Sequence, residues 1–199
     1  IINLLKKLLS TDTNPLRSKS YQIMMRNTDR ILHLTNQLLD VRKIDKGQLE
    51  LKFEEIELIS YIESICALFE DQIEAKEIKF NFKHSNEILH AWVDPNYFDK
   101  IIQNLVANSL KFVPKGGAVT LVLEQLDPQT QAYDRPYFQI SVIDDGIGIE
   151  PGMEQLIFER FYQDKSTPYH IEGTGIGLNL TRSIAELHHG TIYAQNNAN

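Results

Sequence analysis

Three polar side chains recur at helical spacing in residues 103–111. Asn104, Asn108 and Lys111 are separated by four and three positions, so a helix would place them along one stripe. Two amides and an ammonium group are poor material for a hydrophobic core. They suit a site that holds a metal ion and anionic oxygens, so this stripe is the first candidate for a functional site.

Two glycine clusters lie further along the chain. Gly146 and Gly148 follow Asp144 at the end of a predicted strand, where glycine lets the backbone approach a flat ligand. The second cluster, residues 173–178, precedes a helical pattern, and free amides at a helix start favour phosphate. A P-loop is excluded because no Gly-Lys-Ser/Thr follows these glycines. A Rossmann motif is excluded because the second cluster follows a polar loop instead of a strand.

These residues belong to four short motifs in a fixed order. The motifs are Asn104-x-x-x-Asn108, Asp144-x-Gly146-x-Gly148-Ile149, Phe158-Glu159-Arg160-Phe161-Tyr162 and Gly173-Thr174-Gly175-Ile176-Gly177-Leu178. Together they resemble the N, G1, F and G2 boxes of sensor histidine kinases, whose catalytic domain has the Bergerat ATP-binding fold. Residues 26–40 resemble the second helix of that family's dimerisation and phosphoacceptor domain, so the resemblance covers nearly the whole chain.

The resemblance implies that the chain binds ATP with Mg²⁺. Asp144 would accept a hydrogen bond from the adenine amino group, and Asn108 would ligate Mg²⁺, with Asn104 as a further candidate ligand. Lys111 would contact the phosphates and take part in catalysis together with Asn104. The other nucleotide-binding positions that the resemblance implies are Phe112, Gly146, Gly148, Ile149, Phe158, Tyr162, Gly173, Thr174, Gly175, Ile176, Gly177 and Leu178.

Asn104 distinguishes between two reactions. Related ATPases of this fold, such as gyrase and the heat-shock chaperone, carry a glutamate base at the matching position, and an amide cannot take a proton from water. Transfer to a nucleophilic histidine needs no strong base. The resemblance therefore implies a protein-histidine kinase that passes the γ-phosphate to a histidine for relay to a response-regulator aspartate. A Bergerat-fold ATPase, an anti-sigma-type protein-serine kinase and a dimerisation module with a decayed pocket are the alternatives.

Two positions depart from the family pattern. Gln163 directly follows the third motif, where many family members have an arginine that meets the γ-phosphate. Glu172 adds a negative charge beside Gly173. Residues 163–172 are polar, and we interpret them as a mobile loop that closes over the triphosphate.

The elements that must position these residues form an α+β pattern. Residues 1–9 and 15–45 have helical spacing and predict a hairpin, which Gly47 ends. Its second arm has a narrow apolar seam that includes Ile31 and Leu38, which predicts a homodimer through the N-terminal helices. Beyond the hairpin we predict strands at residues 49–53, 78–82, 89–93, 119–125, 137–143 and 191–195, and helices at residues 58–75, 95–112, 154–162 and 177–189.

We therefore predict two domains. Residues 1–47 form a truncated dimerisation and phosphoacceptor hairpin, and residues 48–199 form a Bergerat-fold α/β sandwich with a mixed, mostly antiparallel sheet, whose last strand we expect to be missing. His33 is the only histidine of the hairpin, and no acceptor motif surrounds it. We expect the acceptor to precede Ile1, so this chain would contain no phosphoacceptor and would not autophosphorylate.

Composition limits the partners. The chain has 199 residues and a net charge of −7, which argues against a nucleic-acid surface. It has no apolar run of about 18 residues, so no membrane contact by this fragment is expected. Cys66 is the only cysteine, which fits a reducing cytosol. By resemblance, the chain is the cytoplasmic part of a membrane-anchored sensor, and its partner is a response-regulator receiver domain.

Overall fold

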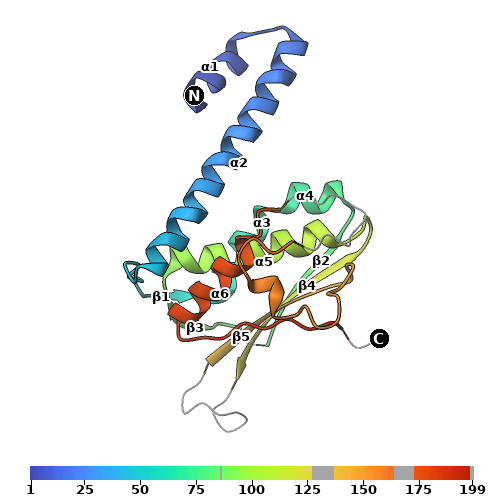
Figure 1. The fold of residues 1–199 in the computed structure, drawn as a ribbon. Helices are drawn as coiled ribbons and strands as arrows, with labels where there is room; N and C mark the ends of the chain where they lie inside the picture. The colour runs from blue at the N-terminus through green and yellow to red at the C-terminus, as the bar shows by residue number, and fades with distance from the viewer. Residues whose placement is uncertain (86, 127–136, 164–172, 198–199) are drawn as a thin grey trace. The chain divides into compact units, whose positions relative to one another are not determined.

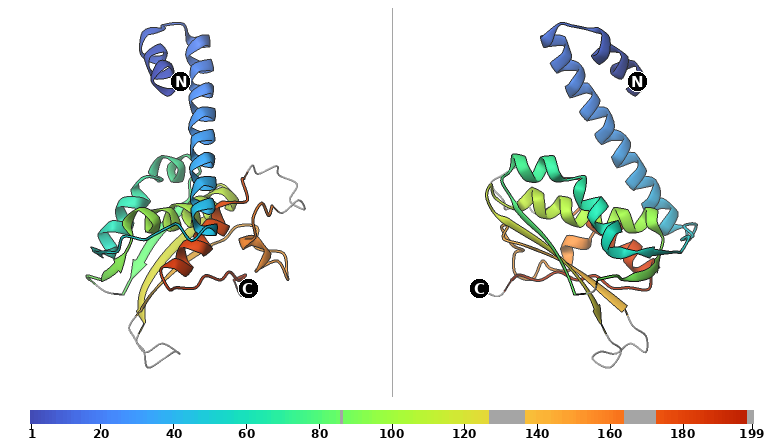
Figure 2. Two further views of the ribbon diagram at one scale, coloured as in Figure 1. Left: turned by 60° about the vertical axis from the view of Figure 1, so that its left-hand side comes forward. Right: turned by 180° about the vertical axis from the view of Figure 1, so that it is seen from behind.

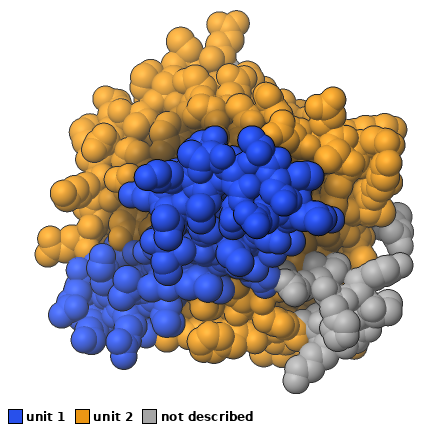
Figure 3. Space-filling view, turned by 90° about the horizontal axis from the view of Figure 1, so that it is seen from above, with its two compact units in different colours: residues 1–49 blue, residues 50–199 orange. Residues whose placement is uncertain are grey.

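The structure, a computed structural model, describes residues 1–85, 87–126, 137–163 and 173–197. It consists of two compact units, Ile1–Leu49 and Glu50–Asn199 (Figure 3). The first unit is entirely helical in its regular structure, and the second contains all the described strands.

The first unit is a helical hairpin. Helix α1 (Ile2–Thr11) and the longer α2 (Pro15–Asp45) run in opposite directions through a short turn (Figure 1). Asn14 begins α2 by accepting hydrogen bonds from the backbone amides of Leu16 and Arg17, at 3.0 and 3.4 Å. Beside it, the Tyr21 hydroxyl donates to Asp12 at 3.0 Å. The turn is therefore fixed by side chains at both of its ends.

The second unit contains two sheets. Strands β1 (Glu54–Glu57) and β3 (His90–Val93) form an antiparallel pair. The larger sheet has the order β2-β4-β5: β2 (Lys79–His84) is parallel to β4 (Ala118–Leu126), and β4 is antiparallel to β5 (Tyr137–Asp144). The predicted α+β class, with a mixed and mostly antiparallel sheet, is confirmed among the described strands.

Helices cover one face of the larger sheet (Figure 2). They are α3 (Leu58–Ala67), α4 (Glu70–Ala75), α5 (Pro95–Phe112) and α6 (Gly177–Leu187), and a 3₁₀ turn, η2 (Leu156–Phe158), precedes α6. The core is a layer of apolar side chains between α3, α5 and β4. Its fully buried members include Leu58, Ile62, Ile102, Val106, Leu110, Val119 and Leu121. This layer holds α5, which carries the polar stripe, firmly against the sheet.

The strand predicted at residues 49–53 is wrong in position, because β1 begins only at Glu54. Its partner β3 ends at Val93, which pairs with Glu54, and the chain then turns into α5 at Asp94. Residues 49–53 therefore have no strand to pair with. The Lys52 amide instead donates to the Asp94 carboxylate at 2.7 Å.

Three other predicted elements also differ. The helix predicted at residues 58–75 is split between α3 and α4, where the Leu68 and Phe69 amides bond three residues back and Phe69 packs on the core. Residues 154–162 form only η2, and residues 191–195 form no strand. No helix in the described part of the chain is both long enough and apolar enough to cross a bilayer.

Candidate active site

Helix α5 is fixed at both ends by side chains. Asp94 caps its start by accepting hydrogen bonds from the amides of Asn96 and Tyr97, at 3.0 and 3.2 Å. Pro95 follows in the first turn, where proline is favoured. At the other end, the Lys76 ammonium group donates to the Leu110 carbonyl at 2.6 Å, where a cation also complements the helix dipole. The polar stripe is thus carried by a helix of defined length and register.

The stripe on α5 faces the second glycine cluster. The Asn104 side-chain amide donates to the Gly177 carbonyl and to the Thr181 hydroxyl, both at 3.3 Å. The Lys111 ammonium group is near Gly173, since a Cβ built on that glycine would be 2.8 Å from it. Asn104 thus contacts Gly177 and Lys111 lies near Gly173, although the two residues of each pair are at least 62 positions apart in the sequence.

Asn108 lies between these two residues on the same stripe and is half-buried. Among the described residues its side-chain amide has no hydrogen-bond partner. A half-buried amide oxygen without a protein partner fits Mg²⁺, which takes few protein ligands and completes its shell with substrate oxygens and water. No group of three or more His, Cys, Asp or Glu side chains in the described part of the chain could hold a metal ion. Asn108 is therefore a residue that could hold a magnesium ion.

Asp144 lies at the end of β5 and is held by two donors. One carboxylate oxygen accepts from the Ser109 hydroxyl at 2.8 Å, and the other accepts from the Gly146 amide at 3.0 Å. Ser109 is 6% exposed and shares the buried face of α5 with Ile102 and Val106. Sequence reasoning missed Ser109. The available signal was a polar residue on an otherwise apolar helix stripe, because a buried hydroxyl needs a partner.

The first glycine cluster packs closely against Asp144 and α5. A Cβ on Gly146 would lie 2.7 Å from the Asp144 carboxylate and 3.2 Å from the Phe112 carbonyl. Gly148 has a φ of +72°, a conformation that side chains disfavour. Glycine is therefore required at both positions, at the first by contact and at the second by conformation.

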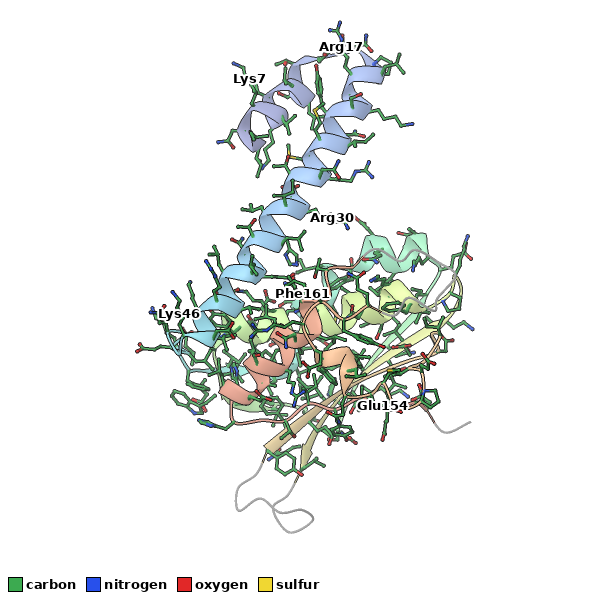
Figure 4. All side chains as sticks on the ribbon, viewed as in Figure 1. Lys7, Arg17, Arg30, Lys46, Glu154 and Phe161 are labelled. Atoms are coloured by element: carbon green, nitrogen blue, oxygen red, sulfur yellow. The ribbon has the colours of Figure 1, made fainter. Side chains whose placement is uncertain are left out.

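The third motif and the second glycine cluster lie side by side. The Phe161 amide donates to the Gly175 carbonyl, and the Gln163 side-chain amide donates to the Gly173 carbonyl, both at 2.8 Å. A Cβ on Gly175 would lie 2.6 Å from the Phe161 backbone. Phe161, labelled in Figure 4, has a φ of +62° and is 64% exposed. The rest of the predicted lid, including Glu172, lies outside the described residues.

Phe158 anchors the third motif through its buried side chain and a hydrogen bond to α6. Its side chain is 2% exposed, and its carbonyl accepts from the Asn179 side chain on α6 at 2.9 Å. Asn179 also accepts from Arg160 at 3.2 Å. The other predicted positions nearby that are half-buried are Phe112, Ile149, Tyr162, Thr174 and Leu178.

The start of α6 differs from the other long helix starts of the second unit. Glu57 and Asp94 cap α3 and α5 with carboxylates, but no described side chain caps the first turn of α6. The Thr174 hydroxyl accepts from the Ile176 amide at 3.1 Å, one position before the helix begins. Uncapped amides at a helix start carry partial positive charge, so this end of α6 favours an anion.

Comparison with known proteins agrees with this geometry. Residues 93–199 match the family described as histidine kinase-, DNA gyrase B- and HSP90-like ATPase. Hybrid signal transduction histidine kinase D of Dictyostelium discoideum is 34% identical over 89% of this chain. The chain spans 11% of the length of that protein, and 12% and 17% of the lengths of two bacterial histidine kinases that it also matches.

Solved structures share the fold. The catalytic domain of histidine kinase ThkA is 28% identical, with a TM-score of 0.62 over 74% of this chain and 90% of that domain. A structure of ThkA in complex with response regulator protein TrrA has a TM-score of 0.63 at 24% identity and covers 98% of this chain and 53% of that one. Full-length ShkA in complex with AMPPNP has a TM-score of 0.79 at 20% identity, over 99% of this chain and 39% of that one.

The family match covers every motif of the site, and the three relatives above and ThkA are histidine kinases. The chain belongs to the histidine kinase-, DNA gyrase B- and HSP90-like ATPase family and is similar to sensor histidine kinases.

Proposed function

We propose that this chain binds ATP with Mg²⁺ and transfers the γ-phosphate to a histidine, from which it passes to a response-regulator aspartate. The observation that carries the proposal is the convergence of Asn104, Lys111 and Asp144 on the two glycine clusters. The second cluster leads into the start of α6, whose first-turn amides are not capped by any described side chain. In this proposal, Asp144 marks the adenine end of the site, and Lys111 with the start of α6 marks the phosphate end.

The adenine end is formed by Asp144 and its supports. Ser109 and the Gly146 amide fix the orientation of the carboxylate before any ligand arrives. A carboxylate held in this way accepts a hydrogen bond from an adenine amino group and discriminates against the carbonyl of guanine. A hydrogen bond to a charged group contributes about 1.5–3 kcal/mol, which is enough to select the base.

The phosphate end is formed by Asn108, Lys111 and the first turn of α6. Lys111 supplies a positive charge beside Gly173, and the α6 amides supply directed donors. We assign Asn108 as the magnesium ligand. When bound, Mg²⁺ would neutralise charge on the β- and γ-phosphate oxygens. Gly173, Gly175 and Gly177 would let the backbone approach those oxygens closely.

Asn104 favours transfer over hydrolysis. Its side chain donates to the Gly177 carbonyl and the Thr181 hydroxyl, so it links the stripe to α6. An amide in this position orients groups through hydrogen bonds but cannot remove a proton from water. A histidine acceptor needs no such removal, because its neutral ring nitrogen is already nucleophilic.

The proposed partners of this chain are a response regulator and a second copy of the same chain. ThkA is described in complex with a response regulator, which supports a receiver domain as the partner of this chain. Helix α2 exposes Ile31 and Leu38, at 64% and 47%, which supports association with a second copy through the N-terminal helices. We assign residues 1–47 to that dimerisation hairpin, residues 48–199 to catalysis, and the chain to the cytoplasmic side of a membrane-anchored sensor.

We further propose that the acceptor histidine is not among these 199 residues. His33 is exposed on α2 between Leu32 and Leu34, and no acidic residue is adjacent to it. The chain should therefore take up no acid-labile label from γ-radiolabelled ATP. Label on His33 would contradict this assignment.

The test of the proposed function is calorimetric binding of AMPPNP with and without Mg²⁺, followed by phosphate release from ATP. We expect magnesium-dependent binding that Asn108→Ala weakens and that Asn81→Ala, on an exposed position of β2, leaves unchanged. Phosphate release should stay near background. Steady release that Asn104→Ala abolishes would instead identify an ATPase, and absence of AMPPNP binding would contradict a nucleotide site altogether.

A further inference from the structure

Two adjacent asparagines near the C-terminus hold the segment Asp144–Ile149 at both of its ends. The Asn196 side chain accepts from the Ile149 amide and donates to the Ile149 carbonyl, both at 2.7 Å. The Asn197 side chain donates to the Asp144 carbonyl at 2.9 Å. Neither asparagine belongs to the four motifs, and Asn196 is 47 positions away from Ile149.

The Asn196 side chain forms with Ile149 the same pair of hydrogen bonds that the backbone of a neighbouring strand would form. A primary amide presents one donor and one acceptor in a plane, the same pair that a peptide group offers. Residues 191–197 form no strand, so this side chain makes the contact to the loop that strand pairing would otherwise make. The two short bonds fix both the position and the orientation of the Ile149 peptide groups.

The same side chain touches Gly148. A Cβ built on Gly148 would lie 2.9 Å from the side-chain oxygen Oδ1 of Asn196, and the backbone of Gly148 has a φ of +72°. The Asn196 side chain therefore occupies the space that a side chain at position 148 would need. Gly146, at the other side of the loop, is held by Asp144 through its amide.

We propose that Asn196 is a positioning residue of the nucleotide site, which fixes the backbone of Gly148 and Ile149 before nucleotide binds. The proposal rests on the proposed function, because it assigns a role toward the nucleotide that the loop would contact. Asn196 itself need not touch the ligand. Its effect is to hold the first glycine cluster in the conformation that the ligand requires.

The consequence is a loss of affinity when the two bonds are removed. Both bonds are made between groups of the chain itself, so they order the loop without a contribution from a ligand, and without them binding would have to supply that order. Removing one or two neutral hydrogen bonds that preorganise a site should weaken binding by about 5- to 20-fold. Amide hydrogen exchange at Ile149 should also become faster, because its amide loses its acceptor.

The experiment compares Asn196→Ala and Asn196→Asp with Asn81→Ala and Asn81→Asp, all in the full chain. The probe is AMPPNP with Mg²⁺, and the measurements are calorimetric affinity, the melting temperature without ligand, and exchange at the Ile149 amide. We expect Asn196→Ala to bind about 5- to 20-fold more weakly with faster Ile149 exchange. The Asn81 variants, which change an exposed side chain of β2, should match the unchanged chain.

Asn196→Asp adds a readout that a purely structural role would not give. At neutral pH its second carboxylate oxygen would face the Ile149 carbonyl and repel it, whereas the protonated acid would donate to that carbonyl as the amide does. The affinity of Asn196→Asp, divided by that of the unchanged chain at the same pH, should rise as the pH is lowered from about 7.5 to about 4, because an aspartic acid side chain is protonated only near its ordinary pKa of about 3.9. The same ratio for Asn81→Asp should stay flat.

The outcomes separate this inference from the proposed function. If the unchanged chain does not bind AMPPNP, the proposed function fails and this inference fails with it. If the unchanged chain binds and Asn196→Ala binds equally well, only the inference is overturned, whatever happens to Ile149 exchange. If Asn196→Ala does not fold, the Asn196→Asp ratio decides: a rise at low pH supports the role, and a flat ratio overturns it.

Discussion

Helices α5 and α6 both carry residues of the site, but side chains cap both ends of α5, whereas no described side chain caps the start of α6. Helix α5 has a carboxylate at its start and an ammonium group from another segment at its end. Helix α6 begins with no described side chain on its first-turn amides. Caps stabilise a helix by satisfying its terminal groups, whereas uncapped amides remain available to a ligand. The difference separates side chains that stabilise the fold from backbone amides that remain available to a ligand.

This comparison divides substitutions into two classes. Changes at the capped helix should alter the free energy of unfolding and leave the affinity for nucleotide largely unchanged. Changes at the ligand-facing groups should alter affinity and leave the unfolding free energy of the nucleotide-free chain largely unchanged. Each substitution therefore needs both measurements, urea unfolding without ligand and calorimetric binding of AMPPNP with Mg²⁺.

The largest effect on stability is expected for Asp94→Ala. Asp94 is 2% exposed, caps α5 and also accepts from the Lys52 amide, so its removal leaves several amides without an acceptor. A lost cap and an unsatisfied buried amide together cost about 2–4 kcal/mol of unfolding free energy. Asp94→Asn keeps an oxygen that can cap α5, but its amide nitrogen would face the Lys52 amide, so it should lose the Lys52 bond and still remain more stable than Asp94→Ala. Equal losses in the two variants, by urea unfolding, would contradict a capping role for Asp94.

A loss of affinity of comparable size is expected for Asp144→Asn. The side-chain nitrogen of the new amide donates and accepts no hydrogen bond, so it would replace one of the two acceptors that now receive the Ser109 hydroxyl and the Gly146 amide, and that position could no longer accept from an adenine amino group. Nucleotide affinity should fall by about 100-fold, the equivalent of losing one hydrogen bond to a charged group. The unfolding free energy should change by less than about 1 kcal/mol, because the carboxylate is only half-buried. Unchanged AMPPNP binding would remove Asp144 from the site.

Lys76→Met should have an intermediate effect on stability. The Lys76 ammonium group donates to the Leu110 carbonyl at 2.6 Å and to the Lys111 carbonyl at 3.3 Å, at the end of α5. Methionine keeps the apolar stem but no donor, so about 1–2 kcal/mol of unfolding free energy should be lost. Lys115→Met is the matched control, because the Lys115 side chain is 65% exposed and, among the residues that the structure describes, pairs only with exposed Glu77. A similar loss in both variants would contradict a capping role for Lys76.

Acid should weaken the cap of α3 in a defined pH range. Hydrogen bonds from the Ser60 hydroxyl and from the backbone amides of Ser60, Ile59 and Leu89 lower the pKa of Glu57 to about 2, from 4.5. Because the folded-state pKa is lowered, this contribution is fully present above pH 4.5 and is lost as the pH falls toward 2. Glu57→Gln should therefore flatten the loss of stability in that range. The effect should be smaller than that of Lys76→Met, since solvent screens this partly exposed carboxylate.

The sequence predicted the polar stripe because one helix carries all three residues. Asn104, Asn108 and Lys111 lie at fixed helical offsets, and the apolar residues between them predict the buried face. The helix bounds could also be predicted, since Asp94-Pro95 is a start signal and Val113-Pro114 an end signal. Local rules sufficed here because the start signal, the end signal and the helical spacing all lie within residues 94–114.

Contacts between distant segments could not be predicted in the same way. The hydrogen bonds of Ser109 with Asp144 and of Asn196 with Ile149 join residues 35 and 47 positions apart. Strand β1 was misplaced because its extent depends on where β3 ends, which its own alternation does not encode. Side-chain amides such as Asn196 give no periodic signal, so their role emerged only from the folded chain.

The smallest predicted effect concerns Glu77, directly after Lys76. Glu77 has a φ of +56°, a conformation that costs a residue with a side chain about 1–2 kcal/mol and costs glycine little. Its ion pair with Lys115 joins two side chains that are each more than 60% exposed, so that pair contributes little. Glu77→Gly should therefore raise the unfolding free energy by about 0.5–1 kcal/mol, after allowance for the extra freedom of glycine in the unfolded chain. Glu77→Ala removes the same ion pair but keeps the strained backbone, so it should give no gain. If the two variants unfolded at the same urea concentration, the positive φ of Glu77 would not lower the stability of the folded chain.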